Sequence, residues 1–230
     1  MPTSPADVLT RRVLPRAVVA LSQVGLPSRL GAATRRLAGR QGRVELFFAF
    51  DDPCSAVAVI DLVARVARRK VELDLKPVVR RGIADDPAVE LKRRHAIVDA
   101  RRVGRRTDLV LSREEPLTAD ATAFLAAWAA RAPRGPARTG FCVRALRRLW
   151  LGSDGPVDPG DYAAIWREQV GGEPPAADGD DGVRRNERLM RRRGPYDTPA
   201  AWVHGQWFFA HDRLVQIGDR LDDLGWTVSP

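Results

Sequence analysis

The most constraining feature of the chain is the junction between a short apolar strand and the helix that follows it. The strand is predicted over residues 44–50, and the helix is expected to begin at Asp52 and Pro53, because Asp is a favoured N-cap and Pro suits the first helical position. A helix start carries unpaired N–H groups and the positive end of the helix dipole, and it stabilises anions such as thiolates and phosphates. The junction therefore predicts either a reactive site around Asp52, Cys54 and Ser55 or a simple helix cap.

Composition limits the classes of protein that need be considered. The chain has 230 residues, 44% of them hydrophobic, which is enough for one core with an insertion or appendage. Cys54 and Cys142 lie far apart and form no CxxC pair, so no disulfide framework is predicted and a reducing cytoplasm is expected. The chain has three histidines, and none of them stands at metal-ligand spacing from either cysteine: His95, His204 and His211. No metal site is therefore expected.

The formal net charge of +9 raises the question of a nucleic acid or an anionic membrane as a partner. Almost all the basic residues are arginines in a chain rich in Ala, Gly and Pro; we interpret this as a compositional bias and expect no nucleic-acid partner. Residues 1–42 hold seven arginines and one acid, Asp7. They are predicted to form a basic arm of short helices broken at Pro15, at residues 25–27 and at Gly31. This arm either packs on the main domain or contacts an acidic partner or a membrane surface.

The order of predicted elements is strand–helix–strand, a helical block, and then strand–strand–helix. The first unit spans residues 44–78 and suits a parallel βαβ arrangement. Helices are expected over residues 86–106, 118–131, 141–151, 162–170 and 183–193, with buried residues in the first of them at Val89, Ile97 and Val103. The two strands 201–203 and 206–209 flank His204 and Gly205, a hairpin signal, and a closing helix is predicted over residues 213–224.

Three segments in this order resemble the DsbA-like proteins, particularly the branch that contains 2-hydroxychromene-2-carboxylate isomerases and kappa-class glutathione transferases. They are residues 48–55 (FAFDDPCS), 75–83 (LKPVVRRGI) and 194–214, which include GPYDTP and the run GQWFFAHDRL. The resemblance covers about residues 43–225. It implies an α/β thioredoxin-like fold with a large helical insertion, divided into a basic N-terminal arm (1–42), a core (43–82 and 194–230) and an insertion (83–193).

The resemblance also bears on the chemistry at the helix start. Redox members carry Cys-x-x-Cys at this turn, whereas here the two positions hold Asp52 and Ser55. Dithiol–disulfide exchange needs a thiol at each of them, so a disulfide oxidase role is not expected. Cys54 lies between these two positions, and its pKa would be lowered if its thiol faced the helix N–H groups. The alternative, which we prefer, is an inert and partly buried thiol. Cys142 is expected to lie in the core.

In glutathione-using members the corresponding turn holds a serine near the glutathione sulfur, and Asp52 takes that place here. A carboxylate there could act as a general base toward a thiol or an acidic C–H, although it would repel a thiolate. The resemblance further implies that Pro199 is the family's cis-proline, with the backbone of Thr198 pairing with an extended ligand. It places Asp212 and Arg213 at the γ-glutamyl end of glutathione, with His211 beside them. Each of these residues also has a purely structural explanation. Pro199 could simply start an edge strand, Asp212 could be an N-cap that forms an ion pair with Arg213, and His211 could be a polar residue at the end of the hairpin.

Two principal hypotheses follow; they are nearly level, and we adopt the first. The first is a glutathione-dependent isomerase or transferase, using glutathione or another low-molecular-weight thiol, that acts on a small electrophilic or aromatic substrate. That substrate would lie between the core and the insertion, in a pocket for which the candidate lining residues are Trp150, Trp166, Trp202 and Trp207. The second is a catalytically degenerate binding or scaffold protein, and a single-cysteine thiol-redox protein is a third alternative. The oligomeric state, including a homodimer, stays open.

Overall fold

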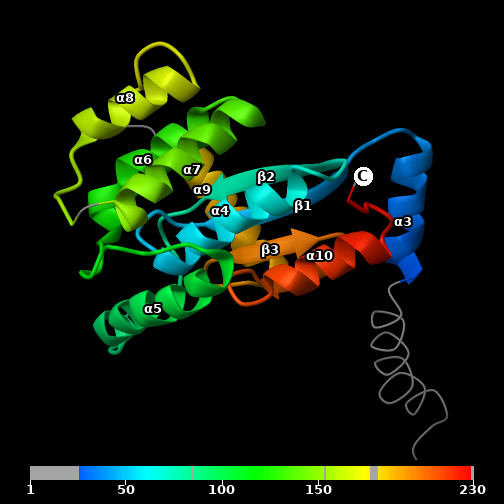
Figure 1. Ribbon diagram of the computed structural model, residues 1–230, viewed down its shortest axis with the longest axis horizontal. Coiled ribbons are helices and arrows are strands. Elements are labelled where there is room, and N and C mark those ends of the chain that lie inside the picture. Colours follow the sequence, from blue (N-terminus) through cyan, green and yellow to red (C-terminus); the bar gives the residue numbers. More distant parts are fainter. Residues whose placement is uncertain (1–25, 84, 153, 177–180, 229–230) are drawn as a thin grey trace, which may run out of the picture.

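The computed structural model describes residues 26–83, 85–152, 154–176 and 181–228. The arm helices predicted before residue 26, with Pro15 and Gly25, lie outside these ranges. The described elements, labelled as in Figure 1, are α3 (Leu26–Leu37), β1 (Gly42–Phe48), α4 (Pro53–Val66), β2 (Val71–Pro77), α5 (Val89–Gly104), the 3-10 turn η2 (Arg105–Thr107), α6 (Ala119–Arg131), α7 (Pro136–Leu151), α8 (Pro159–Gln169), α9 (Asp181–Arg193), β3 (Ala200–Val203), β4 (Gln206–Phe209) and α10 (Leu214–Asp223).

A four-stranded sheet in the order β2-β1-β3-β4 forms the centre of the molecule. β1 pairs with β2 in parallel, from Gly42 opposite Val71 to Phe48 opposite Pro77, and α4 provides the crossover between them. β3 pairs with β1 and with β4 in the antiparallel sense. His204 and Gly205 both have positive φ, as a two-residue hairpin turn that follows the strand twist requires. The predicted α/β fold class, a thioredoxin-like βαβ…ββα core with a helical insertion, is therefore confirmed.

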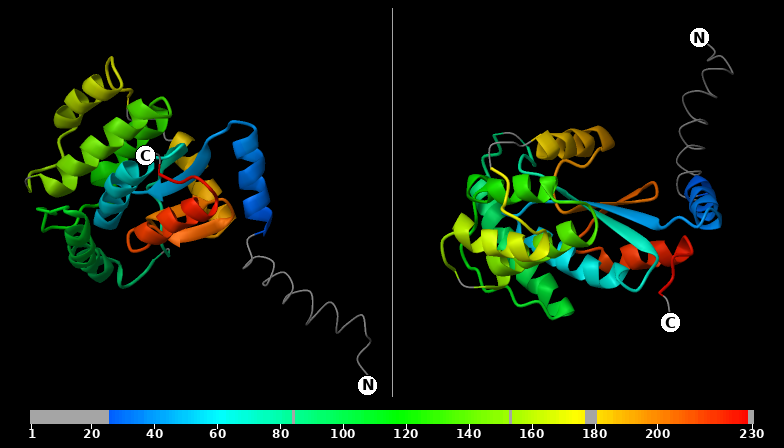
Figure 2. Two further views of the ribbon diagram at one scale, coloured as in Figure 1. Left: turned by 45° about the vertical axis from the view of Figure 1, so that its right-hand side comes forward. Right: turned by 90° about the horizontal axis from the view of Figure 1, so that it is seen from above.

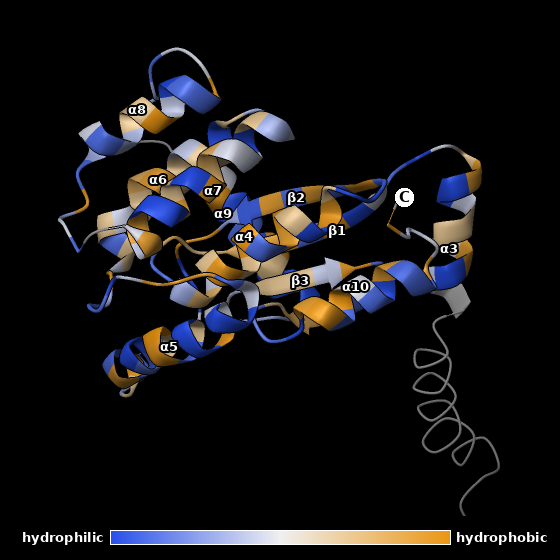
Figure 3. Cartoon of the chain, viewed as in Figure 1, coloured by the Kyte–Doolittle hydropathy of each residue, from blue (hydrophilic) through white to orange (hydrophobic). Residues whose placement is uncertain are grey.

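The principal core lies on the sheet face that α4 and α10 cover. Val44, Leu46 and Phe48 alternate toward this face and are fully buried, as the two-residue period of a strand demands. The helices α6, α7 and α8 add an aromatic cluster that continues the same core, which contains Trp128, Phe141 and Trp166. Hydropathy colouring shows apolar residues gathered on the inner sides of these elements (Figure 3).

The opposite sheet face is covered in part by α9. Phe47 packs there in a smaller cluster with Met190. Toward the β1 start, the same face carries a buried charge network in which Asp74 bonds Arg43 and Lys76 while Glu45 bonds Arg193. Buried charges are tolerated when they are paired in this way.

Several expected boundaries differ from the observed ones. Gly31 lies inside α3 and does not break it, since one glycine costs a helix only about 1 kcal/mol. The strand predicted to reach Phe50 ends at Phe48, because the chain turns at residues 49–52 to start α4. Val89, expected to be buried, is exposed; Ile97 is buried as predicted, and Val103 is half-buried. None of the helices within the described residues is both long and apolar enough to cross a bilayer.

The helices are distributed unevenly around the sheet. α5, α6, α7 and α8 gather at one end, near the start of α4, whereas α3 lies at the other end, beside the C-terminal end of α10 (Figures 1 and 2). The carboxyl ends of the parallel strands β1 and β2 therefore face the helical insertion. In open α/β sheets this is the end at which ligand sites form.

Candidate functional site

Asp52 caps the helix that begins at the carboxyl end of β1. The backbone of Asp52 is extended, and Pro53 occupies the first turn of α4. The Oδ1 atom of Asp52 accepts a hydrogen bond from the Cys54 backbone N–H at 3.0 Å. This is the geometry of an Asx cap. The capping function predicted from the sequence is thus present, and the remaining contacts of Asp52 decide whether it can do more.

Two hydroxyl groups donate to the second oxygen of the same carboxylate. Ser55 Oγ lies 2.6 Å and Thr198 Oγ1 lies 3.0 Å from Asp52 Oδ2, and Ser55 Oγ in turn accepts from the Ala49 N–H at 3.2 Å. Thr198 precedes Pro199 in a cis peptide bond at the start of β3. The structure thus brings Asp52, Ser55 and Thr198 together across 146 positions of sequence.

Three charged side chains surround Asp52, namely those of Arg81, Asp51 and Asp197. Arg81 forms a two-pronged ion pair with the neighbouring Asp51, at 2.8 and 3.0 Å, and its Nε lies 3.8 Å from Asp197. Burial raises the pKa of Asp52, and it outweighs the lowering by the Arg81 charge and by the Ser55 hydrogen bond. For Arg81 the order is reversed: burial lowers its pKa, but the carboxylates of Asp51 and Asp52 raise it above the ordinary value. A buried carboxyl with a raised pKa on the wall of a cleft makes Asp52 a candidate for proton transfer.

A cleft of about 600 Å³ opens beside these residues, between the sheet and the helical insertion. Asp52 and Thr198 lie on its wall. The other contributors are the loop after β2, one side of α5, the start of α6, α9 and the β4–α10 turn; the lining residues used below are Cys54, Arg80, Arg81, Arg191, Asp197 and His211. This is the position predicted for a substrate, although the substrate itself stays a prediction.

The predicted site residues divide into three groups. Asp52, Cys54, Thr198 and His211 line the cleft, whereas Ser55 and Pro199 are buried behind it. His211 is half-buried, and its Nδ1 is shielded from solvent with no hydrogen-bond partner among the described residues.

Asp212 and Arg213 are exposed and do not line the cleft. Asp212 was expected, in the bland alternative, to cap the last helix, but Arg213 holds the cap position of α10 and no side-chain cap bond forms there. The two side chains instead approach each other, with Arg213 Nε 3.8 Å from Asp212 Oδ1. A γ-glutamyl subsite at these two residues would lie outside the cleft.

Cys54 has the environment of an inert thiol. It is 6% exposed, and its Sγ lies 3.6 Å from the Ala96 carbonyl oxygen as a donor rather than facing the helix N–H groups. Burial, followed by the charge of Asp52, raises the pKa of the Cys54 thiol far above its ordinary value. Since a thiolate is the reactive form, the preferred interpretation of Cys54 as inert agrees with the structure. Cys142 lies fully buried in the core, where burial raises its pKa to about 12.

The tryptophans proposed to line the pocket do not do so. None of Trp150, Trp166, Trp202 and Trp207 belongs to the described cleft. Trp150 is fully buried and donates to the Phe50 carbonyl at 2.9 Å, and Trp166 packs in the aromatic cluster of the insertion. The described cleft wall is mainly charged and aliphatic, and its aromatic rings are those of Tyr196 and His211.

The cleft residues that sequence reasoning missed include Arg80, Arg81, Asp197 and Arg191. Arg80, Arg81 and Asp197 lie in two of the three segments that carry the family resemblance, so the segments could have indicated them. The arginines are masked by the abundance of arginine in the chain. Arg80 and Arg191 are exposed and have no carboxylate within ion-pair distance in the part of the chain that the structure describes. They give the mouth of the cleft free positive charge. No group of three or more metal-ligating side chains occurs among the described residues.

Sequence comparison and structure comparison give different results. No family profile and no curated protein sequence matches the chain. Among solved structures, a 2-hydroxychromene-2-carboxylate isomerase aligns with a TM-score of 0.63 and 15% identity, over 79% of this chain and 95% of its own. The cytosolic disulfide reductase DsbM from Pseudomonas aeruginosa aligns with a TM-score of 0.50 and 15% identity, over 79% of this chain and 96% of its own. At these identities the similarity concerns the fold: the chain has the DsbA-like thioredoxin fold, a thioredoxin core with a helical insertion.

Proposed function

We propose that the cleft binds glutathione or another low-molecular-weight thiol beside Pro199, and that the protein is an isomerase or transferase acting on a small electrophile. The observation that carries this proposal is the buried Asp52 carboxylate, fixed by Ser55 and Thr198 on the cleft wall. A bound thiol would supply a sulfur nucleophile for addition to an electrophilic carbon. The solved isomerase with the same fold supports the class of reaction as an analogy only.

The raised pKa of Asp52 supports its assignment as the proton acceptor in this role. Among the described residues its Oδ1 accepts one hydrogen bond, from the Cys54 N–H, and a carboxylate oxygen has room for a second donor. Burial raises the pKa of Asp52 toward that of a thiol, which lowers the cost of moving a proton from sulfur to carboxylate. Asp52 would take the proton of the incoming S–H and return it to the product or the leaving thiol, so the carboxyl ends the cycle in its starting state.

Ligand binding at Thr198 requires a local exchange. Its backbone N–H, the donor that an extended ligand would use, is held by the Asp197 carboxylate at 2.8 Å. The same carboxylate lies near Arg81 and is 47% exposed, so it can swing away and leave both donors to the ligand. Arg80 and Arg191 at the cleft mouth have no carboxylate partner among the described residues and suit the carboxylates that a thiol such as glutathione carries.

A second candidate, a binding protein with a decayed site, is favoured by one observation. Every hydrogen bond of Asp52 has an intramolecular partner that also serves as structure: a cap, a turn and a strand start. A carboxylate kept only for these bonds would need no substrate. The two candidates differ in what replacement of Asp52 does to turnover.

The test is calorimetric titration with reduced glutathione and with an S-alkyl glutathione, followed by thiol addition to conjugated electrophiles. Under the enzyme proposal, the wild-type chain binds thiol saturably and D52S and D52N lose turnover, while D197A binds the thiol more tightly because the Thr198 N–H is free. The exposed variant D212A, which removes a carboxylate outside the cleft, is the matched control. Equal turnover in D52N and wild type would remove Asp52 from the chemistry, and absence of binding to wild type and D197A alike would reject a thiol ligand.

A further inference from the structure

The helix α3 presents its leucines to solvent. Leu30 is 67% exposed and Leu37 is 90% exposed; seven residues apart, they lie two turns from each other on one face of the helix. Ala32, on the opposite face, is fully buried against the core. In a surface helix of a globular protein the apolar stripe normally faces the core, so the orientation of α3 is the reverse of the usual one.

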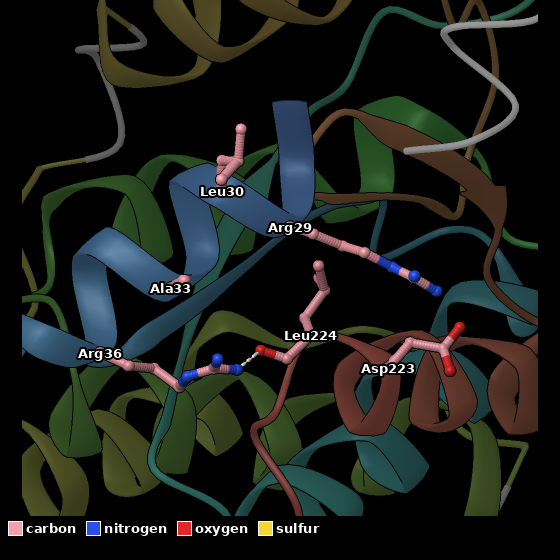
Figure 4. A pocket seen from close by; sticks show the side chains of 6 residues that line it. All are labelled: Arg29, Leu30, Ala33, Arg36, Asp223 and Leu224. Atoms are coloured by element: carbon pink, nitrogen blue, oxygen red, sulfur yellow. Dashed lines mark hydrogen bonds between the residues drawn. The ribbon is translucent and has the colours of Figure 1, made fainter. Parts of the chain in front are cut away.

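The orientation of α3 is fixed by contacts on its inner side. Arg36 donates to the Leu224 carbonyl at the end of α10 and lies over the Trp226 ring at 5.9 Å. Arg36 and Leu224 border a hollow of about 430 Å³ that Leu30 also lines, and Figure 4 shows the Leu30 side chain directed away from the Arg36–Leu224 bond. These contacts attach α3 to the rest of the molecule in the orientation that leaves Leu30 and Leu37 exposed.

Three cations lie beside α3: Arg29 lines the hollow with Leu30, and Arg40 and Lys70 line a neighbouring hollow with Arg36 and Trp226. Arg29, Arg40 and Lys70 are exposed, and no carboxylate lies within ion-pair distance of them in the described ranges. Asp223 is the one carboxylate on the wall of the described hollow. The sequence that precedes α3 has the same character, with Arg11, Arg12 and Arg16 among apolar residues in positions 8–21.

We infer that α3 and its basic rim dock on the surface of an anionic lipid bilayer. A bilayer accounts for both the apolar and the basic part of the surface, because leucines enter the acyl boundary while arginines and lysines contact the phosphate groups. A second copy of the chain would cover the leucines but would bring two arginine-rich surfaces together. A nucleic acid would match the cations and leave Leu30 and Leu37 exposed. α3 lies at the end of the molecule opposite the helical insertion (Figure 2), so the cleft stays open on a bound molecule.

The full chain should be sedimented with vesicles of phosphatidylcholine containing about 30% phosphatidylglycerol, and with vesicles of phosphatidylcholine alone. We expect binding to the anionic vesicles only, weakened by salt. L30S/L37S should lower the partition coefficient at least about tenfold, since each leucine loses its burial in the bilayer. R40Q/K70Q should lower it by about 25-fold, from roughly fivefold for each surface cation.

Matched variants on the far side of the molecule distinguish binding through the α3 surface from nonspecific binding of exposed apolar and basic residues to vesicles. L91S/V110S removes two apolar side chains that are also largely exposed, at 59% and 75%, and R105Q/R106Q removes two exposed cations from η2. Both should bind vesicles as the wild type does, and thermal melts should show every variant folded. Equal binding to neutral and anionic vesicles, or equal loss in the α3 and control variants, would overturn the inference. So would a dimer in light scattering that L30S/L37S dissolves while vesicle binding is absent.

Discussion

Replacing Arg81 by methionine should destabilise the protein strongly, because it leaves a buried carboxylate without its partner. The Asp51 side chain is only 2% exposed and accepts both prongs of the Arg81 guanidinium, at 2.8 and 3.0 Å. Removing one partner of a buried pair costs about 3–5 kcal/mol, since the remaining charge is neither solvated nor compensated. A typical domain has a total stability of about 5–15 kcal/mol. R81M should therefore lose a large part of the stability of the folded chain.

The assay is urea unfolding at 25 °C and pH 7, followed by tryptophan fluorescence and circular dichroism. Arg102, which pairs with Asp99 on the exposed side of α5, provides the control, since exposed pairs contribute about 0–1 kcal/mol. R102M should therefore lie within about 1 kcal/mol of the wild type, and R81M should lie at least about 3 kcal/mol below it. The double variant D51N/R81M removes the stranded charge and should recover a substantial part of that loss. If R81M cost no more than R102M, or if D51N gave no recovery, the pair would not hold the site together as described.

Three further predictions concern Cys54, Gly42 and Asp52. Cys54 should react with iodoacetamide at neutral pH far more slowly than a free thiol, and at an ordinary rate in urea, because burial raises its pKa; fast labelling of the native chain would revive the redox alternative. G42A should lower the unfolding free energy by about 1–3 kcal/mol, because an added Cβ would lie 2.6 Å from the Trp226 ring, whereas G31A, with open space around it, should not. The folded-state pKa of Asp52 is raised, so the contribution of this residue to folding stability is complete below the unfolded pKa of about 3.9 and is lost as pH rises through the folded pKa. The urea midpoint of D52N should therefore rise relative to that of the wild type from pH 4 to pH 7. A difference in midpoint that stayed constant over this range would count against the raised pKa.

The elements that the sequence predicted well are those whose signals are local. The start of α4 follows from an Asp–Pro pair, and the β3–β4 hairpin follows from a glycine between apolar strands; both appear where expected. The position of Asp52 at a strand-to-helix turn needs only such signals. Its approach to Thr198 could be expected only from the family resemblance, because no local pattern reports a contact between residues so distant in sequence.

The elements that the sequence missed depend on tertiary packing. Trp150 and Trp166 look like pocket residues in a list of aromatics, but the insertion buries them to build its own core. Arg81 is one arginine among many, and only the fold shows that it neutralises Asp51 beside the cleft. The outward leucines of α3 were likewise invisible, because helical periodicity gives the angle between apolar residues and not the side on which the core lies.

The contacts of Asp52 connect the stability of the fold with its proposed chemistry. The hydrogen bonds from Cys54, Ser55 and Thr198 hold one conformation of the carboxyl and fasten α4 to β3, so the side chain is preorganised without a ligand. Burial makes its ionised form costly, which a structural cap does not require, since Asn would cap the helix equally well and carry no charge. A residue kept only for structure should therefore be replaceable by Asn without loss of turnover, whereas a proton acceptor should not. A D52N chain that is more stable than the wild type at pH 7 and inactive would identify the buried charge as a stability cost retained for catalysis.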